Sequence, residues 1–141
     1  MYKIAILLVV AFTSLISSDI HWEKDFKSAI NHASSLNKPV MFIFSRHTCK
    51  YCVMLEKEAL SDKRIITALN RDFVSVISYT DENDYTPREL WRPGTPTIWF
   101  LNPNGEPMFQ PIAGAIGADD FVQAVAIVKN EFDKKSKTVS K

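Results

Sequence analysis

Residues 40–52 read VMFIFSRHTCKYC, and this stretch decides the fold. Its first part, residues 40–44, is a continuous apolar run of strand length, which is typical of a strand buried on both faces of a sheet. A Cys-x-x-Cys pair follows it, at the start of a helical pattern over residues 49–60. A buried strand that leads into such a pair at a helix start indicates redox-active thiols.

The position of Cys49 at a helix start gives its thiol a specific chemistry. Unpaired backbone N–H groups and the positive end of the helix dipole stabilise a thiolate there, and the thiolate is the form that attacks disulfides. Cys52, three residues further on, is placed to resolve the mixed disulfide that results. Three basic residues nearby, Arg46, His47 and Lys50, are expected to lower the pKa of Cys49 further.

Glu56 is the candidate proton acceptor for Cys52. It lies four residues after Cys52 and seven after Cys49, so all three share one face of a helix. A carboxylate beneath the dithiol in a low-dielectric setting is suited to take the proton of Cys52. The alternative is an ordinary solvated side chain in the charged run of residues 56–58.

Three other uses of the cysteine pair stay open from the residues alone. A structural zinc site needs four ligands, so His32 and His47 would have to complete it, because the chain has no second pair. A Cu(I) carrier needs only soft thiolates. An inert structural disulfide is the third alternative. No flavin or nucleotide motif is present, so no cofactor is expected.

Helical and strand patterns alternate along the rest of the chain. We expect helices over residues 19–36, 49–60, 65–69, 87–91 and from 118 onward, and strands over 40–44, 73–79, 97–101 and 108–112. This order predicts an α/β domain in which a central mixed β-sheet is flanked by helices.

The N-terminal segment has the pattern of a secretory signal. Lys3 precedes an apolar run over residues 4–16, which is shorter than the ~20 residues of a membrane-spanning helix, and small residues follow. We expect this leader, residues 1–18, to be cleaved or retained as an N-terminal anchor. The folded domain is then expected over residues 19–133, with a polar, basic, solvated tail over 134–141.

Composition excludes several classes of protein. A chain of 141 residues that is 46% hydrophobic and 23% charged fits a single globular domain. Its 17 basic residues against 16 acidic ones lack the positive excess of a nucleic-acid-binding protein, so no nucleic-acid partner is expected. Two cysteines are too few for a disulfide-rich scaffold.

The second informative segment, residues 92–97, reads RPGTPT. Pro96 stands immediately before the apolar run 98–101 and withholds an N–H from the sheet, so it belongs at a strand start or a bend. A cis Thr95–Pro96 peptide bond is one way to make that bend, and an ordinary trans loop proline is the other.

The two motifs, in this order, resemble those of the thioredoxin-fold family. The resemblance is closer to exported thioredoxin-like proteins and to the C-terminal domain of the periplasmic reductase DsbD, and it spans residues 22–128. It implies a thioredoxin fold, a cis Pro96 packed beside the dithiol, and a Thr95 whose backbone pairs with a substrate strand. The segments that carry it are residues 38–44, 49–52, 56, 61–62, 94–97 and 104–105.

The chain departs from thioredoxin at three places. Thr48 replaces the tryptophan before the first cysteine, and residues 50–51, Lys-Tyr, replace Gly-Pro between the cysteines. Ile43 replaces the buried aspartate six residues before the first cysteine. Because that usual proton acceptor is absent, the resemblance assigns its role to Glu56, which matches a glutamate of the DsbD-like group.

The resemblance implies an exported, periplasmic thiol–disulfide oxidoreductase that reduces protein disulfides with Cys49 and Cys52. Its expected substrates are exported proteins that carry disulfides, with apocytochrome c as one candidate, and its expected partner is a membrane electron donor of the DsbD type. The alternatives are a disulfide oxidant or isomerase that runs in the opposite direction, and a copper-carrying or thiol-binding module without turnover.

Overall fold

The computed structural model describes residues 18–139. The expected leader lies outside the described residues except for Ser18, and so do residues 140–141 at the other end. Within the described part of the chain, no helix is both long enough and apolar enough to cross a membrane.

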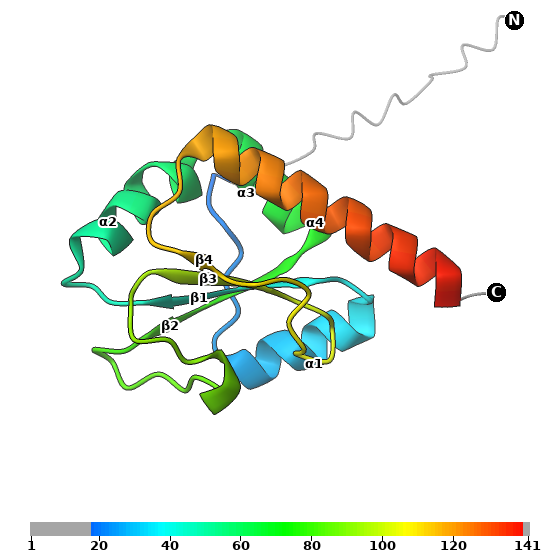
Figure 1. The fold of residues 1–141 in the computed structure, drawn as a ribbon, viewed down its shortest axis with the longest axis horizontal. Coiled ribbons are helices and arrows are strands. Elements are labelled where there is room, and N and C mark those ends of the chain that lie inside the picture. The colour runs from blue at the N-terminus through cyan, green and yellow to red at the C-terminus, as the bar shows by residue number, and fades with distance from the viewer. Residues whose placement is uncertain (1–17, 140–141) are drawn as a thin grey trace, which may run out of the picture.

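A four-stranded mixed sheet forms the centre of the fold (Figure 1). Its strands are β1 (Val40–Ser45), β2 (Val74–Tyr79), β3 (Thr97–Leu101) and β4 (Ile112–Ala113). Their order in the sheet is β2-β1-β3-β4, with β1 parallel to β2 and antiparallel to β3, and β3 antiparallel to β4.

Helices cover both faces of this sheet, which confirms the expected α/β architecture. Figure 1 shows α1 below the sheet and α3 and α4 above it, with α2 beyond the end of β1. The helices are α1 (Phe26–Leu36), α2 (Lys50–Lys57), α3 (Lys63–Asp72) and α4 (Ala118–Val139), and two short 3-10 turns are η1 (Ala59–Ser61) and η2 (Arg88–Leu90).

β1 separates two apolar clusters, because successive side chains of a strand point to opposite faces. Met41 and Ile43 pack with Leu55 of α2 and with residues of α3 and α4. Phe42 and Phe44 pack with residues of α1 on the other face. All six residues of β1 are buried. The strand is therefore held from both sides, and the loop that follows it starts from a fixed point.

The first helix is shorter than the periodicity predicts. It begins at Phe26 rather than at residue 19, because Asp25 caps it by accepting a hydrogen bond from the Ser28 N–H (2.7 Å). The preceding segment is extended along β2, where Trp22 forms a bridge with Ser75. This pairing across the sheet overrides the helical spacing of the apolar residues.

Two later boundaries also differ from expectation. The final strand lies at Ile112–Ala113 instead of 108–112, because Pro111 has no N–H to give to a ladder. The helical segment expected over residues 49–60 ends as α2 at Lys57, and η1 continues it.

The described part of the expected tail is helical, and most of its residues up to 138 are exposed. α4 continues through Val139, so residues 134–139 are helical. Pairs spaced three and four residues apart support this end: Lys129 with Asp133 (2.6 Å) and Lys134 with Glu131 (2.7 Å).

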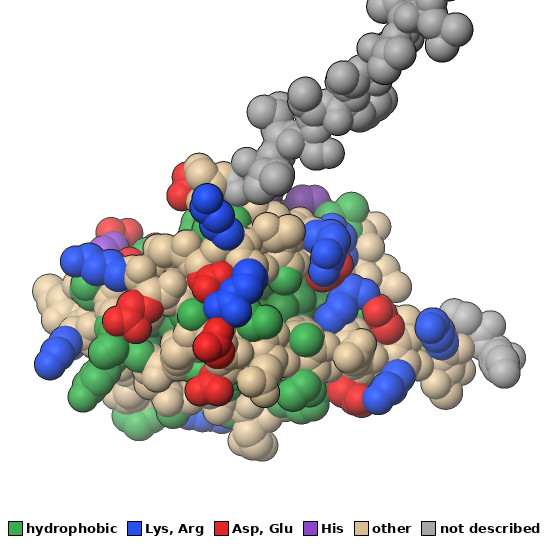
Figure 2. Space-filling view, turned by 90° about the horizontal axis from the view of Figure 1, so that it is seen from above, with side chains coloured by type: hydrophobic (Ala, Val, Ile, Leu, Met, Phe, Trp, Pro, Cys, Tyr) green, Lys and Arg blue, Asp and Glu red, His purple; other side chains and the backbone are tan. Residues whose placement is uncertain are grey.

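The outer face over α3 and α4 carries charges of both signs. Arg64 bonds to Asp62 before α3 and to Asp119 in the first turn of α4, at 2.8 Å each. This arginine therefore ties the two helix starts together. Figure 2 shows basic and acidic side chains interspersed on this face rather than gathered by sign.

Candidate functional site

Cys49 is the N-cap residue of α2. The backbone N–H of Cys52 donates a hydrogen bond to Cys49 Sγ (3.2 Å), so the sulfur takes the place that a serine or aspartate oxygen has in an ordinary N-cap. Cys49 is half-buried, whereas Cys52 is 1% exposed. Both carry free thiols, so the structure represents the reduced site.

The surroundings lower the pKa of Cys49. Burial by itself raises this pKa, but hydrogen bonds with the side chains of Cys52 and Thr95 act in the opposite direction. The backbone groups of Cys52 and Tyr51 add to them, and together these interactions outweigh the burial. The first turn of α2 therefore favours a thiolate at Cys49.

The pKa of Cys52 moves the other way. Burial raises it, and the hydrogen bond with Cys49 raises it further, while the side chains of Ser45 and Thr95 partly oppose the change. The pair thus consists of an accessible sulfur that favours the thiolate and a buried sulfur that favours the thiol. This asymmetry supports attack by Cys49 and resolution by Cys52.

The loop before β3 lies against Cys49. The Thr95–Pro96 peptide bond is cis, and Cys49 Sγ donates a hydrogen bond to the Thr95 carbonyl oxygen (3.4 Å). The Thr97 hydroxyl donates to Gly94 O (2.7 Å) and the Gly114 N–H donates to Pro96 O (2.8 Å), so the loop is fixed at both ends. The structure therefore brings together Cys49, Cys52, Thr95 and Pro96.

An apolar hollow of about 280 Å³ adjoins this loop. It lies between the cis-proline segment and β4, and one of its lining residues, Thr95, accepts the hydrogen bond from Cys49 Sγ. Its lining consists of Arg92, Pro93, Gly94, Thr95, Pro96, Thr97, Pro111, Ala113 and Gly114.

Glu56 lies one helical turn beyond Cys52, and its carboxylate accepts a hydrogen bond from the Tyr79 hydroxyl (3.1 Å). Burial raises the pKa of Tyr79 well above its usual value, and the negative charge of Glu56 adds to the effect. The phenol therefore stays protonated and remains a donor to Glu56. The role of Glu56 as proton acceptor for Cys52 stays a prediction.

The three basic residues before and after Cys49 lie in different surroundings. The His47 ring is stacked on Tyr79 (3.8 Å between centroids), and its Nδ1 is 3.1 Å from a carboxylate oxygen of Asp81. Arg46 and Lys50 are exposed. The hydrogen bonds described above lower the pKa of Cys49, and the contribution of the basic residues to this pKa stays a prediction.

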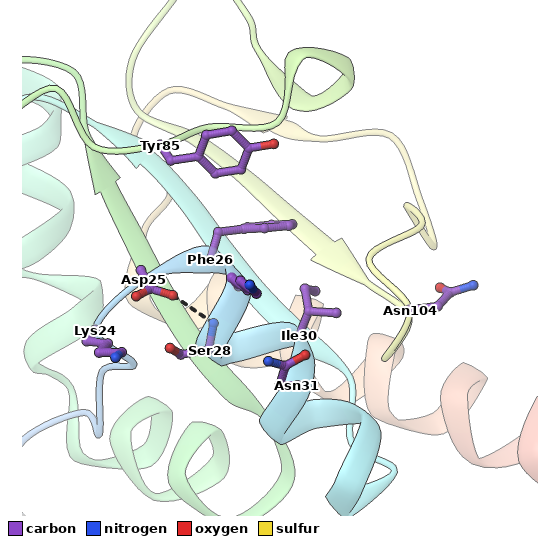
Figure 3. Close-up of a pocket in the computed structure, with 9 residues that line it drawn as sticks. Lys24, Asp25, Phe26, Ser28, Ile30, Asn31, Tyr85 and Asn104 are labelled. Atoms are coloured by element: carbon purple, nitrogen blue, oxygen red, sulfur yellow. Dashed lines mark hydrogen bonds between the residues drawn. The ribbon is translucent and has the colours of Figure 1, made fainter.

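A larger hollow, of about 900 Å³, lies away from the cysteines (Figure 3). It opens between the start of α1 and the loop after β2, where the rings of Phe26 and Tyr85 lie edge to face at 6.3 Å. None of the predicted site residues lines it. Among residues 18–139, no group of three or more His, Cys, Asp and Glu side chains is arranged to hold a metal ion.

The sequence reasoning missed two hydroxyl residues, Ser45 and Tyr79. Each ends one strand of the parallel pair β1 and β2, and they are partners in the register. The sequence does carry a signal for them, because each is a polar residue at the carboxyl end of an apolar strand. The carboxyl ends of the strands form the edge at which α/β sheets bind ligands.

A Cys-x-x-Cys pair at the start of a helix, with a cis-proline loop against its first sulfur and a mixed sheet behind it, defines a dithiol site of the thioredoxin type. Residues 26–129 match the Thioredoxin-like domain family, and the chain belongs to that family. This match confirms the resemblance that the two sequence motifs predicted.

Solved structures of several proteins share the fold. The structure of a thioredoxin from Thermus thermophilus has a TM-score of 0.65 at 25% identity, over 79% of this chain and 88% of that one. DsbH oxidoreductase has a TM-score of 0.64 at 16% identity, over 82% and 88%. The oxidised C-terminal domain of Neisseria meningitidis DsbD has a TM-score of 0.54 at 22% identity, over 69% and 87%.

A curated relative matches in sequence. Anterior gradient protein 3 of Mus musculus is 28% identical over 88 residues, which are 61% of this chain and 52% of the relative. The chain therefore spans about half the length of this relative.

Proposed function

We propose that this protein is an exported thiol–disulfide oxidoreductase that reduces protein disulfides through Cys49 and Cys52. The observation that carries the exchange chemistry is the asymmetry of the pair: the half-buried Cys49 has a lowered pKa, and the buried Cys52 has a raised one. The reducing direction rests on the resemblance to DsbD-like proteins. A pair of this kind divides attack and resolution between its sulfurs.

The reaction consists of two exchanges. The Cys49 thiolate attacks one sulfur of a substrate disulfide, a bond forms between Cys49 and that sulfur, and the other substrate sulfur leaves as a thiolate. Cys52 then loses its proton and attacks the Cys49 sulfur, which releases the second substrate thiolate. Two electrons pass to the substrate, the Cys49–Cys52 disulfide remains, and protons from Cys52 and solvent complete the substrate thiols.

Glu56 and the cis-proline loop have separate roles in this scheme. Glu56 accepts the proton of Cys52 as that sulfur becomes a thiolate. The backbone of Thr95, held at Pro96 beside Cys49, pairs with an extended substrate segment and brings its disulfide to the exposed side of the sulfur. The apolar hollow next to this loop accommodates side chains of that segment.

The leader that the sequence predicts over residues 1–18 suggests both the compartment and the partners. Substrates are exported proteins with disulfides, for which apocytochrome c is a candidate, and a membrane electron donor of the DsbD type restores the dithiol. Fractionation of cells that produce the full chain, with N-terminal sequencing of the product, tests the compartment. Recovery of the protein in the cytoplasm with its leader intact would contradict export.

The opposite direction of electron flow is the second candidate, and the lowered pKa of Cys49 favours it. A stabilised thiolate stabilises the reduced protein, which makes its disulfide a stronger oxidant. Equilibration of Cys49–Cys52 with a glutathione buffer separates the two. A potential well below that of glutathione supports the reductase, and a potential well above it identifies an oxidant.

The central experiment compares Cys49→Ala with Cys52→Ala in a disulfide reductase assay. Loss of all activity in Cys49→Ala is expected, together with a long-lived mixed disulfide between Cys49 and substrate in Cys52→Ala. Undiminished activity of Cys49→Ala would overturn the proposal.

A further inference from the structure

Ser45, at the end of β1, faces the helix that carries the two cysteines. Because side chains alternate along a strand, Ser45 shares its face with Met41 and Ile43. Those two side chains pack in the cluster that contains Leu55 of α2. The Ser45 side chain therefore points toward α2, at the carboxyl end of the strand from which the Cys49 loop departs.

The Ser45 hydroxyl is buried without an ordinary partner. The residue is 0% exposed, and within residues 18–139 its Oγ has no hydrogen-bond partner. Its backbone, in contrast, is tied to the next strand, because Ser45 O accepts a hydrogen bond from the Thr80 N–H (3.0 Å). Buried hydroxyls are normally satisfied, so one held rigidly without a partner calls for an explanation.

The Cys52 thiol lies on the same side: Cys52 is buried and stands one helical turn before Leu55, on the face of α2 that packs against β1. The interaction with the Ser45 side chain lowers the pKa of Cys52, against the larger effect of its burial. A neutral thiol is a weak hydrogen-bonding group and makes little demand on the hydroxyl. A thiolate in the same place, 1% exposed and out of reach of water, needs a donor.

The Arg46 backbone also lowers the pKa of Cys52, but among the described side chains around this sulfur Ser45 is the donor without another partner. Tyr79, its partner in the register, points to the next turn of α2 and donates to Glu56. Glu56 receives the Cys52 proton in the proposed scheme, and its carboxyl group is held by the Tyr79 hydroxyl, away from the Cys52 sulfur. The Thr95 side chain lowers the pKa of both cysteines. It therefore supports attack by Cys49 as well as resolution by Cys52, and is not specific to the second step.

We propose that the Ser45 hydroxyl is the hydrogen-bond donor that stabilises the Cys52 thiolate as it attacks the mixed disulfide at Cys49. The inference rests on the proposed function, whose second step it concerns. Ser45 keeps its own proton throughout. The proton of Cys52 passes to Glu56, the Cys52–Cys49 bond forms, and the substrate sulfur leaves as a thiolate.

The hydrogen bond is tested first without any reaction. Cys52 carrying a ¹³C label is titrated by NMR in a Cys49→Ala protein, with and without Ser45→Ala. Removing Cys49 eliminates its coupled titration, while Glu56 and Tyr79, the other titratable groups on this face of α2 and β2, are the same in both proteins. We expect Ser45→Ala to raise the pKa of Cys52 by about one unit.

The reaction itself is tested in single-turnover mixing with a nitrobenzoate disulfide, which releases one coloured thiolate in each exchange. With both cysteines present, Ser45→Ala is expected to leave the first release unchanged and to slow the second about threefold, because one pKa unit removes about nine-tenths of the thiolate while the thiolate that remains is a better nucleophile. Ser45→Thr, which keeps the hydroxyl, is expected to restore the second release.

Ser75→Ala is the matched control. Ser75 lies on β2, is 2% exposed, and its Oγ also has no partner among the described residues. An equal slowing in Ser75→Ala would overturn the inference, as would an unchanged pKa of Cys52 in Ser45→Ala. If Ser45→Ala raises the pKa of Cys52 but the unsubstituted protein reduces no disulfide, the hydrogen bond is upheld and the proposed function is refuted.

Discussion

The Tyr79 hydroxyl donates a hydrogen bond to the Glu56 carboxylate at 3.1 Å, which joins the end of β2 to the helix that carries the cysteine pair. Tyr79 also stacks on His47 in the loop before Cys49. One side chain therefore contacts both the segment that leads into the dithiol and the helical turn that follows it. Its position fixes the orientation of Glu56 relative to α2.

Replacement of Tyr79 by phenylalanine tests this link. Tyr79→Phe keeps the ring on His47 but removes the donor to Glu56, and we expect a loss of about 1 kcal/mol in the free energy of unfolding. Urea denaturation of Tyr79→Phe, Glu56→Ala and the double variant measures the coupling between the two side chains. Strictly additive losses would show that the hydrogen bond contributes nothing to stability.

Substitution of Glu56 by glutamine separates its structural role from its proposed chemical one. The amide oxygen of Glu56→Gln still accepts the Tyr79 hydrogen bond, but the side chain no longer takes a proton. We expect resolution by Cys52 to slow about 100-fold, as for loss of a general base, while attack by Cys49 is unchanged. The second release in the nitrobenzoate assay measures this, with Glu58→Gln, an exposed carboxylate of the same segment, as control. Equal rates in the two variants would remove Glu56 from the mechanism.

Hydrophobic periodicity predicts the elements whose structure depends only on neighbouring residues in the chain. The strand expected over 97–101 is observed at Thr97–Leu101, because its five residues are apolar or β-branched and all are buried. The start of α1 was predicted seven residues too early, since the pairing of Trp22 with Ser75 joins residues far apart in the chain. Such pairing leaves no trace in helical spacing.

The residues of the candidate site also fall into two groups, those that a sequence motif reveals and those that only the fold brings to the site. The Cys-x-x-Cys pair and the loop at Pro96 are readable as motifs, because each needs particular residue types at fixed spacing. The roles of Tyr79 and Ser45 depend on the parallel register of β1 and β2, which places both side chains against α2. A sequence pattern shows that a strand ends in a polar residue, but not which helix covers it.

Removal of the Thr95 hydroxyl is predicted to raise the pKa of Cys49. Thr95→Val loses one of the hydrogen bonds that lower this pKa. Alkylation of the reduced protein at a range of pH values gives the midpoint for the accessible thiol, expected below the free-thiol value of about 8.5 and displaced upward in Thr95→Val. Thr48→Val, at the exposed neighbour of Cys49, is the control, and a displacement of equal size there would contradict the assignment.

The lowered pKa of Cys49 also makes the stability of the reduced protein depend on pH. A thiolate that is favoured in the folded state stabilises that state fully above the pKa of the unfolded thiol, and the contribution is lost as pH falls through the lower folded value. We therefore expect the free energy of unfolding of the reduced protein, relative to Cys49→Ala, to rise with pH between these two values. A difference that is flat across this window would contradict the lowered pKa.

The basic residues around Cys49 are predicted to act through the solvent and therefore weakly. Arg46→Gln and Lys50→Gln remove exposed charges near the sulfur, and each is expected to raise the alkylation midpoint by a few tenths of a unit at low ionic strength. His47→Asn is expected to have the smallest effect, because the carboxylates of Asp81 and Glu82 lie beside its ring and oppose its charge. Since screening shortens the reach of surface charges, the three shifts are expected to fade in molar salt, whereas that of Thr95→Val persists. Salt-independent shifts at Arg46 and Lys50 would instead indicate direct contact with the Cys49 thiolate.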